Sequence, residues 1–151
     1  MHKDADHAMK QLTDEEALDY IERFHGHIGP YVVLGYRAGL IALRELGQDP
    51  FTKRAFSFTG FKPPVSCFTD GVQLGSCCTL GKGNIRVEDM AQARVRFERK
   101  DGSKTVEISL LEETGLRISG AKSWEDSEEL ARKMILEPDE RLFAIKVDER
   151  V

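Results

Sequence analysis

The segment FHGHIGP, residues 24–30, ends one predicted helix and begins the next, and it carries two imidazoles two residues apart on a glycine-rich turn. Upstream, a capping box at residues 13–16 and apolar residues at helical spacing predict a helix that ends at the first histidine. Downstream, Pro30 suits the first position of a second helix. The turn between these helices can therefore aim both imidazole rings at one point.

The second predicted helix, residues 30–46, contains Gly35, Ala38, Gly39 and Ala42 at close spacing. A glycine in a helix interior costs about 1 kcal/mol relative to alanine, so we expect another element to pack very close to this face. The pattern predicts a buried central helix. A docking surface for a larger partner protein is the alternative use of the same small residues.

The remaining pattern predicts an α+β fold, with a mixed or antiparallel sheet packed against helices. Asp101-Gly102 is typical of a hairpin turn between two strongly alternating segments. Helices come first, strands gather later, and no alternation of strands with helices is present. The expected strands are residues 54–61, 92–99, 104–110 and 142–147, and the further expected helices are residues 70–77 and 123–136.

Length and composition indicate one folded domain. The chain has 151 residues, 40% of them hydrophobic and 32% charged, which is ordinary globular usage. We expect residues 13–151 to form the domain and residues 1–12 to be disordered. The net charge of -4 disfavours a nucleic-acid partner. The absence of a long apolar run or secretory signal predicts a cytoplasmic protein without a membrane partner.

Every cysteine of the chain lies in one segment, CFTDGVQLGSCCTLGKGN at residues 67–84. An odd number of cysteines in a chain that can build its own core favours reduced thiols over a disulfide scaffold. Cys67 and Cys78 are the candidate thiolates, but both can face one cavity only if the loop after the expected helix folds back. The adjacent Cys77 is assigned to core packing. Lys82 lacks the spacing of a phosphate-binding loop, yet it can hold an anion or lower the pKa of a nearby thiol.

Taken together, the two segments resemble the FmdE family, the E subunit of formylmethanofuran dehydrogenase and its free-standing relatives. The family motif Phe-His-Gly-His-x-Cys-Pro, followed by Leu-Gly-x-Arg, is similar to residues 24–37. A later motif, Cys-x-x-Asp-x-x-Gln and then Gly-Cys-Thr-Leu-Gly-Lys-Gly-Asn, is similar to residues 67–84. The chain departs from the pattern at Gly29 and Cys77, where the family often has cysteine and glycine, respectively.

The resemblance implies a dimeric α+β core domain without the C-terminal zinc finger that some relatives carry. It also implies a setting in methanogenic or related one-carbon metabolism, beside a molybdenum or tungsten oxidoreductase. The dehydrogenase chemistry itself is not implied, since nothing in this chain could hold a pterin cofactor or an iron–sulfur cluster with four thiolates.

The leading functional hypothesis is a site for zinc or another transition metal, because two nitrogens and two sulfurs suit tetrahedral zinc. Asp70 would orient an imidazole or act as a base. The expected ligands are His25, His27, Cys67 and Cys78.

Two further hypotheses stay open. In the first, the protein is a metal-free thiol enzyme or redox protein in which Cys78 or Cys67 is the nucleophile, a histidine such as His27 is the base, and Lys82 lowers the thiol pKa. In the second, the domain is an accessory or assembly subunit that docks on a larger oxidoreductase. Whether the protein catalyses a reaction is left open by the sequence.

Overall fold

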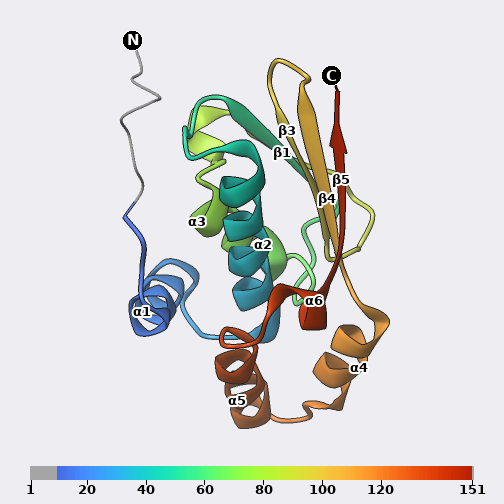
Figure 1. Ribbon diagram of the computed structural model, residues 1–151. Coiled ribbons are helices and arrows are strands. Elements are labelled where there is room, and N and C mark those ends of the chain that lie inside the picture. Colours follow the sequence, from blue (N-terminus) through green and yellow to red (C-terminus); the bar gives the residue numbers. More distant parts are fainter. Residues whose placement is uncertain (1–9, 151) are drawn as a thin grey trace.

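The computed structural model describes residues 10–150, so most of the expected disordered segment, residues 1–12, lies outside the described residues. Helices and strands follow one another in an α+β fold (Figure 1). No helix within the described range is long and apolar enough to cross a membrane. The elements in chain order are α1 (Asp14–His25), α2 (Pro30–Leu46), β1 (Lys53–Ser57), α3 (Cys67–Ser76), the 3-10 helix η1 (Leu80–Lys82), β2 (Ile85–Val87), β3 (Arg94–Arg99), β4 (Lys104–Leu110), α4 (Glu112–Gly120), α5 (Trp124–Met134), α6 (Asp139–Leu142) and β5 (Phe143–Glu149).

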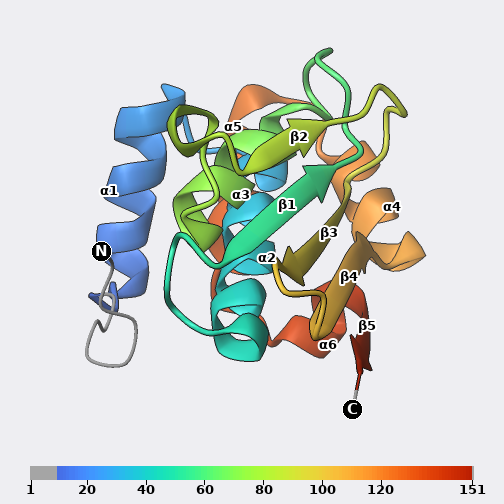
Figure 2. The same cartoon turned by 90° about the horizontal axis from the view of Figure 1, so that it is seen from above.

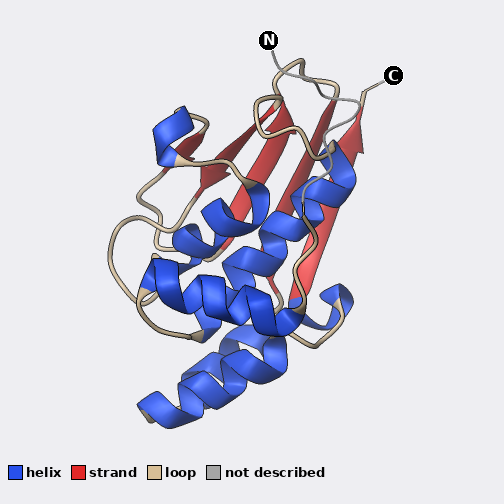
Figure 3. Cartoon of the chain, turned by 90° about the vertical axis from the view of Figure 1, so that its left-hand side faces the viewer, coloured by secondary structure: helices blue, strands red, loops and turns tan. Residues whose placement is uncertain are grey.

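The strands form one mixed sheet in the order β2-β1-β3-β4-β5, with β1 and β2 parallel and the other neighbours antiparallel. The expected hairpin is confirmed, because Val95 pairs with Ile108 and Phe97 with Val106. All four of these side chains are fully buried. Helices α2 and α3 lie against one face of this sheet, as Figures 2 and 3 show from two directions.

Local signals set the ends of the first two helices as expected. Thr13 accepts a hydrogen bond from the amide of Glu16, whose side chain accepts one from the Thr13 amide in return. Helix α1 ends at His25 because Gly26 adopts a left-handed φ of 97° and its N–H reaches the carbonyl of Glu22. Helix α2 begins with Pro30 after Gly29 as N-cap.

Glycines on both sides allow α2 and α3 to pack backbone against backbone. A methyl group at Gly35 would meet the backbone of Phe68 and Val72, and one at Gly39 would lie 2.7 Å from Cα of Gly75. The residue numbers on the two helices rise together along the contact, so the helices run parallel. The small-residue face of α2 is therefore filled by α3, and the expectation that this face docks on a larger partner is wrong.

Two further element boundaries differ from the sequence expectation, and both follow local features of the backbone. The strand expected to reach residue 61 ends at Ser57, because the chain bends at Gly60, where φ is 66°. Helix α3 begins at Cys67, three residues before the expected start, since the preceding turn supplies the carbonyl of Pro64 to the Cys67 amide.

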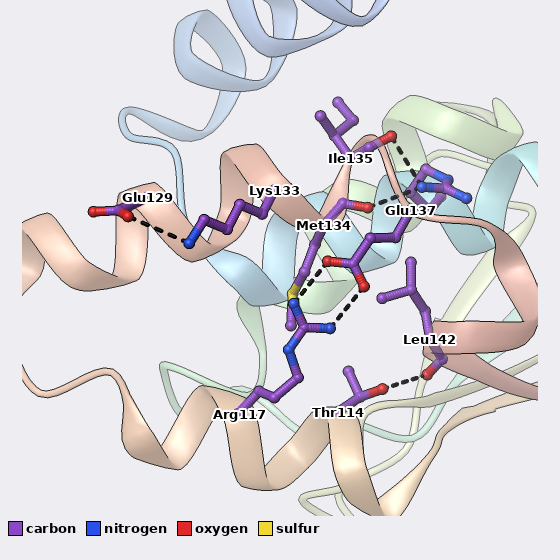
Figure 4. A network of polar contacts seen from close by, with 9 residues as sticks. Thr114, Arg117, Glu129, Lys133, Met134, Ile135, Glu137 and Leu142 are labelled. Atoms are coloured by element: carbon purple, nitrogen blue, oxygen red, sulfur yellow. Dashed lines mark hydrogen bonds and ion pairs between the residues drawn. The ribbon is translucent and has the colours of Figure 1, made fainter.

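Helix α4 was not expected, and contacts distant in sequence hold it. Its Thr114 hydroxyl donates to the carbonyl of Leu142 at 2.8 Å, and Arg117 donates two hydrogen bonds of 2.7 Å to Glu137 (Figure 4). Gly115 and Gly120 lower the intrinsic helix propensity of the segment, so its sequence alone gives a weak helix signal.

Candidate metal centre

Parallel packing of α2 and α3 brings both helix N-termini to the same end of the domain. The turn after α1 lies directly before the N-terminus of α2, so its two histidines reach this end. On α3, Cys67 and Asp70 stand three residues apart in the first turn and therefore share one face of the helix. The fold thus places the histidine turn and the first turn of α3 side by side.

Three donor side chains converge there. One ligand atom each from His25, His27 and Cys67 lies within 4.8 Å of the others, and all three residues are half-buried. Donors around tetrahedral zinc, with bonds of about 2.0–2.3 Å, are separated by roughly 3.3–3.7 Å, so a small inward movement would complete the site. Two imidazole nitrogens and a thiolate form a donor set that zinc accepts.

Asp70 orients the first histidine. Its Oδ2 atom lies 2.6 Å from Nδ1 of His25, which donates the hydrogen bond to the carboxylate. This hydrogen bond, and next the Cys67 thiol, raise the pKa of His25 to about 9, although burial acts in the opposite direction. The other ring nitrogen, Nε2, is buried and has no hydrogen-bond partner among the described residues. A buried ring nitrogen beside a cysteine sulfur is well placed to bind a cation.

The second histidine is positioned by ring contacts. The centroid of the His27 ring lies 4.6 Å from that of His25 and 4.7 Å from that of Trp124, the first residue of α5. Trp124 is 68% exposed, so its indole covers His27 from the solvent side. Helix α5 therefore contributes to the site even though it carries none of the clustered donors.

Cys78 lies outside this cluster. It follows the C-terminus of α3, whereas Cys67 begins the helix, and ten helical residues span about 15 Å. The Cys78 side chain is fully buried, and its amide donates to the Ser76 hydroxyl at 3.0 Å. The loop after α3 does not fold back toward the histidines, as a shared site for both sulfurs would have required, so the cluster contains three of the four expected ligands.

Lys82 lies at the Cys78 end of α3 and donates a hydrogen bond to Thr79 at 2.7 Å. Burial raises the pKa of both the Cys77 and the Cys78 thiols, although the positive charges of Lys82 and Lys53 oppose this rise. Neither thiol is therefore activated at neutral pH. Their environment favours a structural role, which was the expectation for Cys77.

A cavity of about 450 Å³ opens beside the donor cluster and includes His25, Cys67 and Asp70 in its wall. Most of its remaining wall is apolar, and two large apolar side chains on it, Phe61 and Leu80, are 76% and 81% exposed. A pocket of this size next to polar donors is typical of a small-molecule site.

Comparison with known proteins shows the family to which the chain belongs. The model of the family described as FmdE, Molybdenum formylmethanofuran dehydrogenase operon, matches residues 24–145, from the histidine turn into the last strand. The match covers well over half of the chain, and the chain belongs to the FmdE family.

Two individual relatives add to this comparison. A probable S-adenosyl-L-methionine-binding protein of Archaeoglobus fulgidus is 33% identical over 89 residues, 58% of this chain and 24% of that protein, so the chain spans about a quarter of its length. The crystal structure of a tungsten formylmethanofuran dehydrogenase FmdE-like protein from Syntrophus aciditrophicus superposes with a TM-score of 0.67. The sequence identity is 21%, and the superposition covers 93% of this chain and 74% of the other. This neighbour has the same fold.

Several site residues escaped sequence interpretation. Trp124 gave no signal, because it stands almost a hundred residues from His27 and meets it only through tertiary packing. In the sequence, the pattern around Phe61 and Leu80 indicates only ordinary apolar residues of a strand and a loop. Gln73 belongs to the second motif, and its spacing of three residues from Asp70 could have placed it on the same helix face.

Proposed function

We propose that the chain is a metal-binding protein in which His25, His27 and Cys67 hold one zinc ion. The observation that carries the proposal is the convergence of one donor atom each from His25, His27 and Cys67 within 4.8 Å, with Nε2 of His25 buried and outside ordinary hydrogen-bond geometry to any described residue. An unpaired buried polar atom costs free energy, and a bound cation removes that cost.

The roles of the surrounding residues follow from their contacts. Asp70 holds the proton on Nδ1 of His25, and a metal would bind at Nε2 by displacing the proton that the raised pKa keeps there at neutral pH. Trp124 restricts the rotation of the His27 ring. When bound, zinc would supply a Lewis acid at the edge of the pocket. Three protein donors leave a coordination position free, which is typical of catalytic or ligand-binding zinc sites rather than structural ones.

The thiol-enzyme alternative finds less support. Its main candidate nucleophile, Cys78, is buried with a raised pKa, and its candidate activator, Lys82, binds Thr79 instead. Cys67, the other candidate nucleophile, does lie close to a histidine. That histidine belongs to the same donor cluster, which suits a metal ion.

Metal analysis of freshly purified protein tests the proposal. The wild-type chain should carry about one zinc ion per chain, and Cys67→Ser and His27→Ala should each lose most of it. Cys78→Ser is the matched control, because it removes a sulfur that lies outside the cluster and should keep the metal. Equal zinc content in the Cys67→Ser and Cys78→Ser proteins, or none in the wild type after reconstitution, would refute the proposal.

Membership of the FmdE family supports a role beside formylmethanofuran dehydrogenase-type one-carbon metabolism. We propose that the chain serves such a system as a homodimer and contacts a molybdenum or tungsten enzyme. Light scattering of the purified protein tests the dimer, for which a mass near twice 17.0 kDa is expected. A monomer at micromolar concentration would contradict it.

A further inference from the structure

One face of α3 continues from the donor cluster into the adjacent pocket. Cys67, Asp70 and Gln73 recur every three residues, and all of them line the cavity of about 450 Å³. The helix therefore presents a thiol, a carboxyl and an amide group in a row along the pocket wall. Cys67 and Asp70 belong to the proposed metal site, whereas Gln73 is not required for metal binding.

Gln73 is held with its amide group in a defined orientation. Its Oε1 atom accepts a hydrogen bond of 3.1 Å from the backbone N–H of Leu80. The Nε2 group makes no hydrogen bond to any residue between 10 and 150, and the side chain is half-buried in the pocket wall. An oriented amide donor in a pocket is suited to an oxygen atom of a ligand.

Much of the remaining pocket wall is apolar. Phe61, Pro63, Leu80, Ile85 and Val87 provide it, from the loop after β1, from η1 and from β2. Single exposed apolar residues are normal on a protein surface, but Phe61 and Leu80 flank the same cavity with more than three-quarters of their surface exposed. A ligand with an apolar body would cover them both.

We propose that this pocket binds a small carboxylate-class molecule with an apolar body. Its carboxylate oxygens would bind the zinc at the position that His25, His27 and Cys67 leave free, and one of them would accept a hydrogen bond from Nε2 of Gln73. The apolar body would lie against Leu80 and Phe61. This inference rests on the metal site proposed above and adds the class of ligand that the site receives.

Charge balance is consistent with an anionic head group. The thiolate of Cys67 offsets one of the two positive charges of zinc, and the Asp70 carboxylate shares a proton with His25. The N-termini of α2 and α3 both point toward this end of the domain, and helix N-termini favour negative charge. Among the described residues that line the pocket, Asp70 is the only carboxylate available to a cationic head group, and it is already bound to His25.

Hydroxamates, which mimic carboxylates and bind transition metals, provide the test. The chain is loaded with cobalt, its metal content is measured first, and benzohydroxamate and acetohydroxamate are then titrated by calorimetry and by visible absorption of the cobalt. We expect both to change the cobalt spectrum, with benzohydroxamate binding at least about tenfold more tightly through its ring.

Two variants separate the head-group contact from the apolar contact. Gln73→Glu keeps an acceptor for the Leu80 N–H but loses the donor, so the affinity for both hydroxamates should fall about tenfold. Leu80→Ser should bring the two affinities close together, whereas Leu116→Ser, an exposed leucine on α4 outside the pocket wall, should leave their ratio unchanged.

The outcomes distinguish the two proposals. A chain that holds cobalt but binds both hydroxamates equally, or releases the cobalt to them, overturns the ligand inference and leaves the metal site intact. Unchanged affinity in Gln73→Glu also overturns it. A wild-type chain that fails to bind cobalt or zinc at the first step removes the proposed function and this inference with it.

Discussion

The Oδ2 atom of Asp70 lies 2.6 Å from Nδ1 of His25, and this contact joins the first turn of α3 to the last residue of α1. It holds the Nδ1 proton, so Nε2 is the ring nitrogen that would release its proton and bind a metal. A carboxylate that orients a ligating histidine in this way commonly increases metal affinity about 10- to 100-fold.

Replacement of Asp70 by asparagine is therefore expected to weaken zinc binding about 10- to 100-fold. Competition with a chromophoric chelator measures the affinity. Asp148→Asn, which changes an exposed carboxylate on β5, is the matched control and should bind zinc as the wild type does. If the Asp70→Asn protein also binds zinc normally, Asp70 does not orient the ligand.

Gly29 occupies a position from which a side chain would point at the site. A Cβ atom there would lie 3.1 Å from Cε1 and 3.4 Å from Nδ1 of His27, and the extended φ of -139° permits any residue. We expect Gly29→Cys to supply a fourth donor, to raise zinc affinity about tenfold or more and to exclude further ligands. Gly29→Ala adds the same Cβ without sulfur and should not gain affinity. Equal affinity in both variants would show that the position does not face the metal.

The contact between His27 and Trp124 gives the site an optical signal, since the chain has a single tryptophan. Binding of cobalt or nickel at His27 should quench the indole emission strongly, because ions with a partly filled d shell quench a fluorophore within a few ångströms. His27→Ala should abolish the quenching, whereas Cys78→Ser should retain it. Full emission in a cobalt-loaded wild-type protein would place the metal elsewhere.

Close contact between α2 and α3 should make the glycines on this face intolerant of any side chain. A methyl group at Gly71 would overlap the backbone of Val32 and Tyr36, so Gly71→Ala is expected to lower the free energy of unfolding by about 3 kcal/mol or more. Gly115 lies in α4 with open space around it, so Gly115→Ala should raise the free energy of unfolding by about 0.5–1 kcal/mol. Urea denaturation measures both. A stable Gly71→Ala protein would contradict the tight packing.

Asp139 links α2 to the segment after α5 and makes the stability depend on pH. Burial raises its pKa, but hydrogen bonds from Arg44 at 2.7 Å and Arg37 at 2.9 Å outweigh this effect and hold the pKa below its usual value. The same Arg37 donates to the carbonyls of Met134 and Ile135 at the end of α5. The ion pairs thus anchor α5, and with it Trp124, to the central helix.

The sign of the pH dependence follows from the lowered pKa. The stabilisation from Asp139 is fully present above the ordinary carboxyl pKa of about 4 and is lost as the pH falls through the lower folded value. Asp139→Asn should therefore lower the free energy of unfolding by about 1–3 kcal/mol at pH 7. The difference in unfolding free energy between the variant and the wild type should shrink below about pH 4. Urea denaturation at several pH values measures this, and a difference that grows on acidification would contradict the assignment.

Short-range signals in the sequence were sufficient for the local structure around the site. The capping box at Thr13, the left-handed Gly26 and the proline at the start of α2 each act within a few residues, so they fix where the histidine turn lies whatever packs against it. The alternation around Val95 and Phe97 fixed the hairpin for the same reason. The sequence also predicted a metal site of His25, His27, Cys67 and Cys78 with Asp70 beside it, and the structure brings these residues together except for Cys78.

Only the tertiary structure decided which sulfur joins the histidines. Cys67 and Cys78 are equivalent as residue types, but α3 is a rigid spacer between them, and its parallel contact with α2 brings just its first turn to the site. The cover by Trp124 and the pocket beside Gln73 likewise depend on elements distant in sequence. Capping and periodicity operate over one or two turns of chain. The choice among distant side chains depends instead on how whole helices pack. In this protein the packing of α2 against α3 depends on glycines that let the two backbones touch.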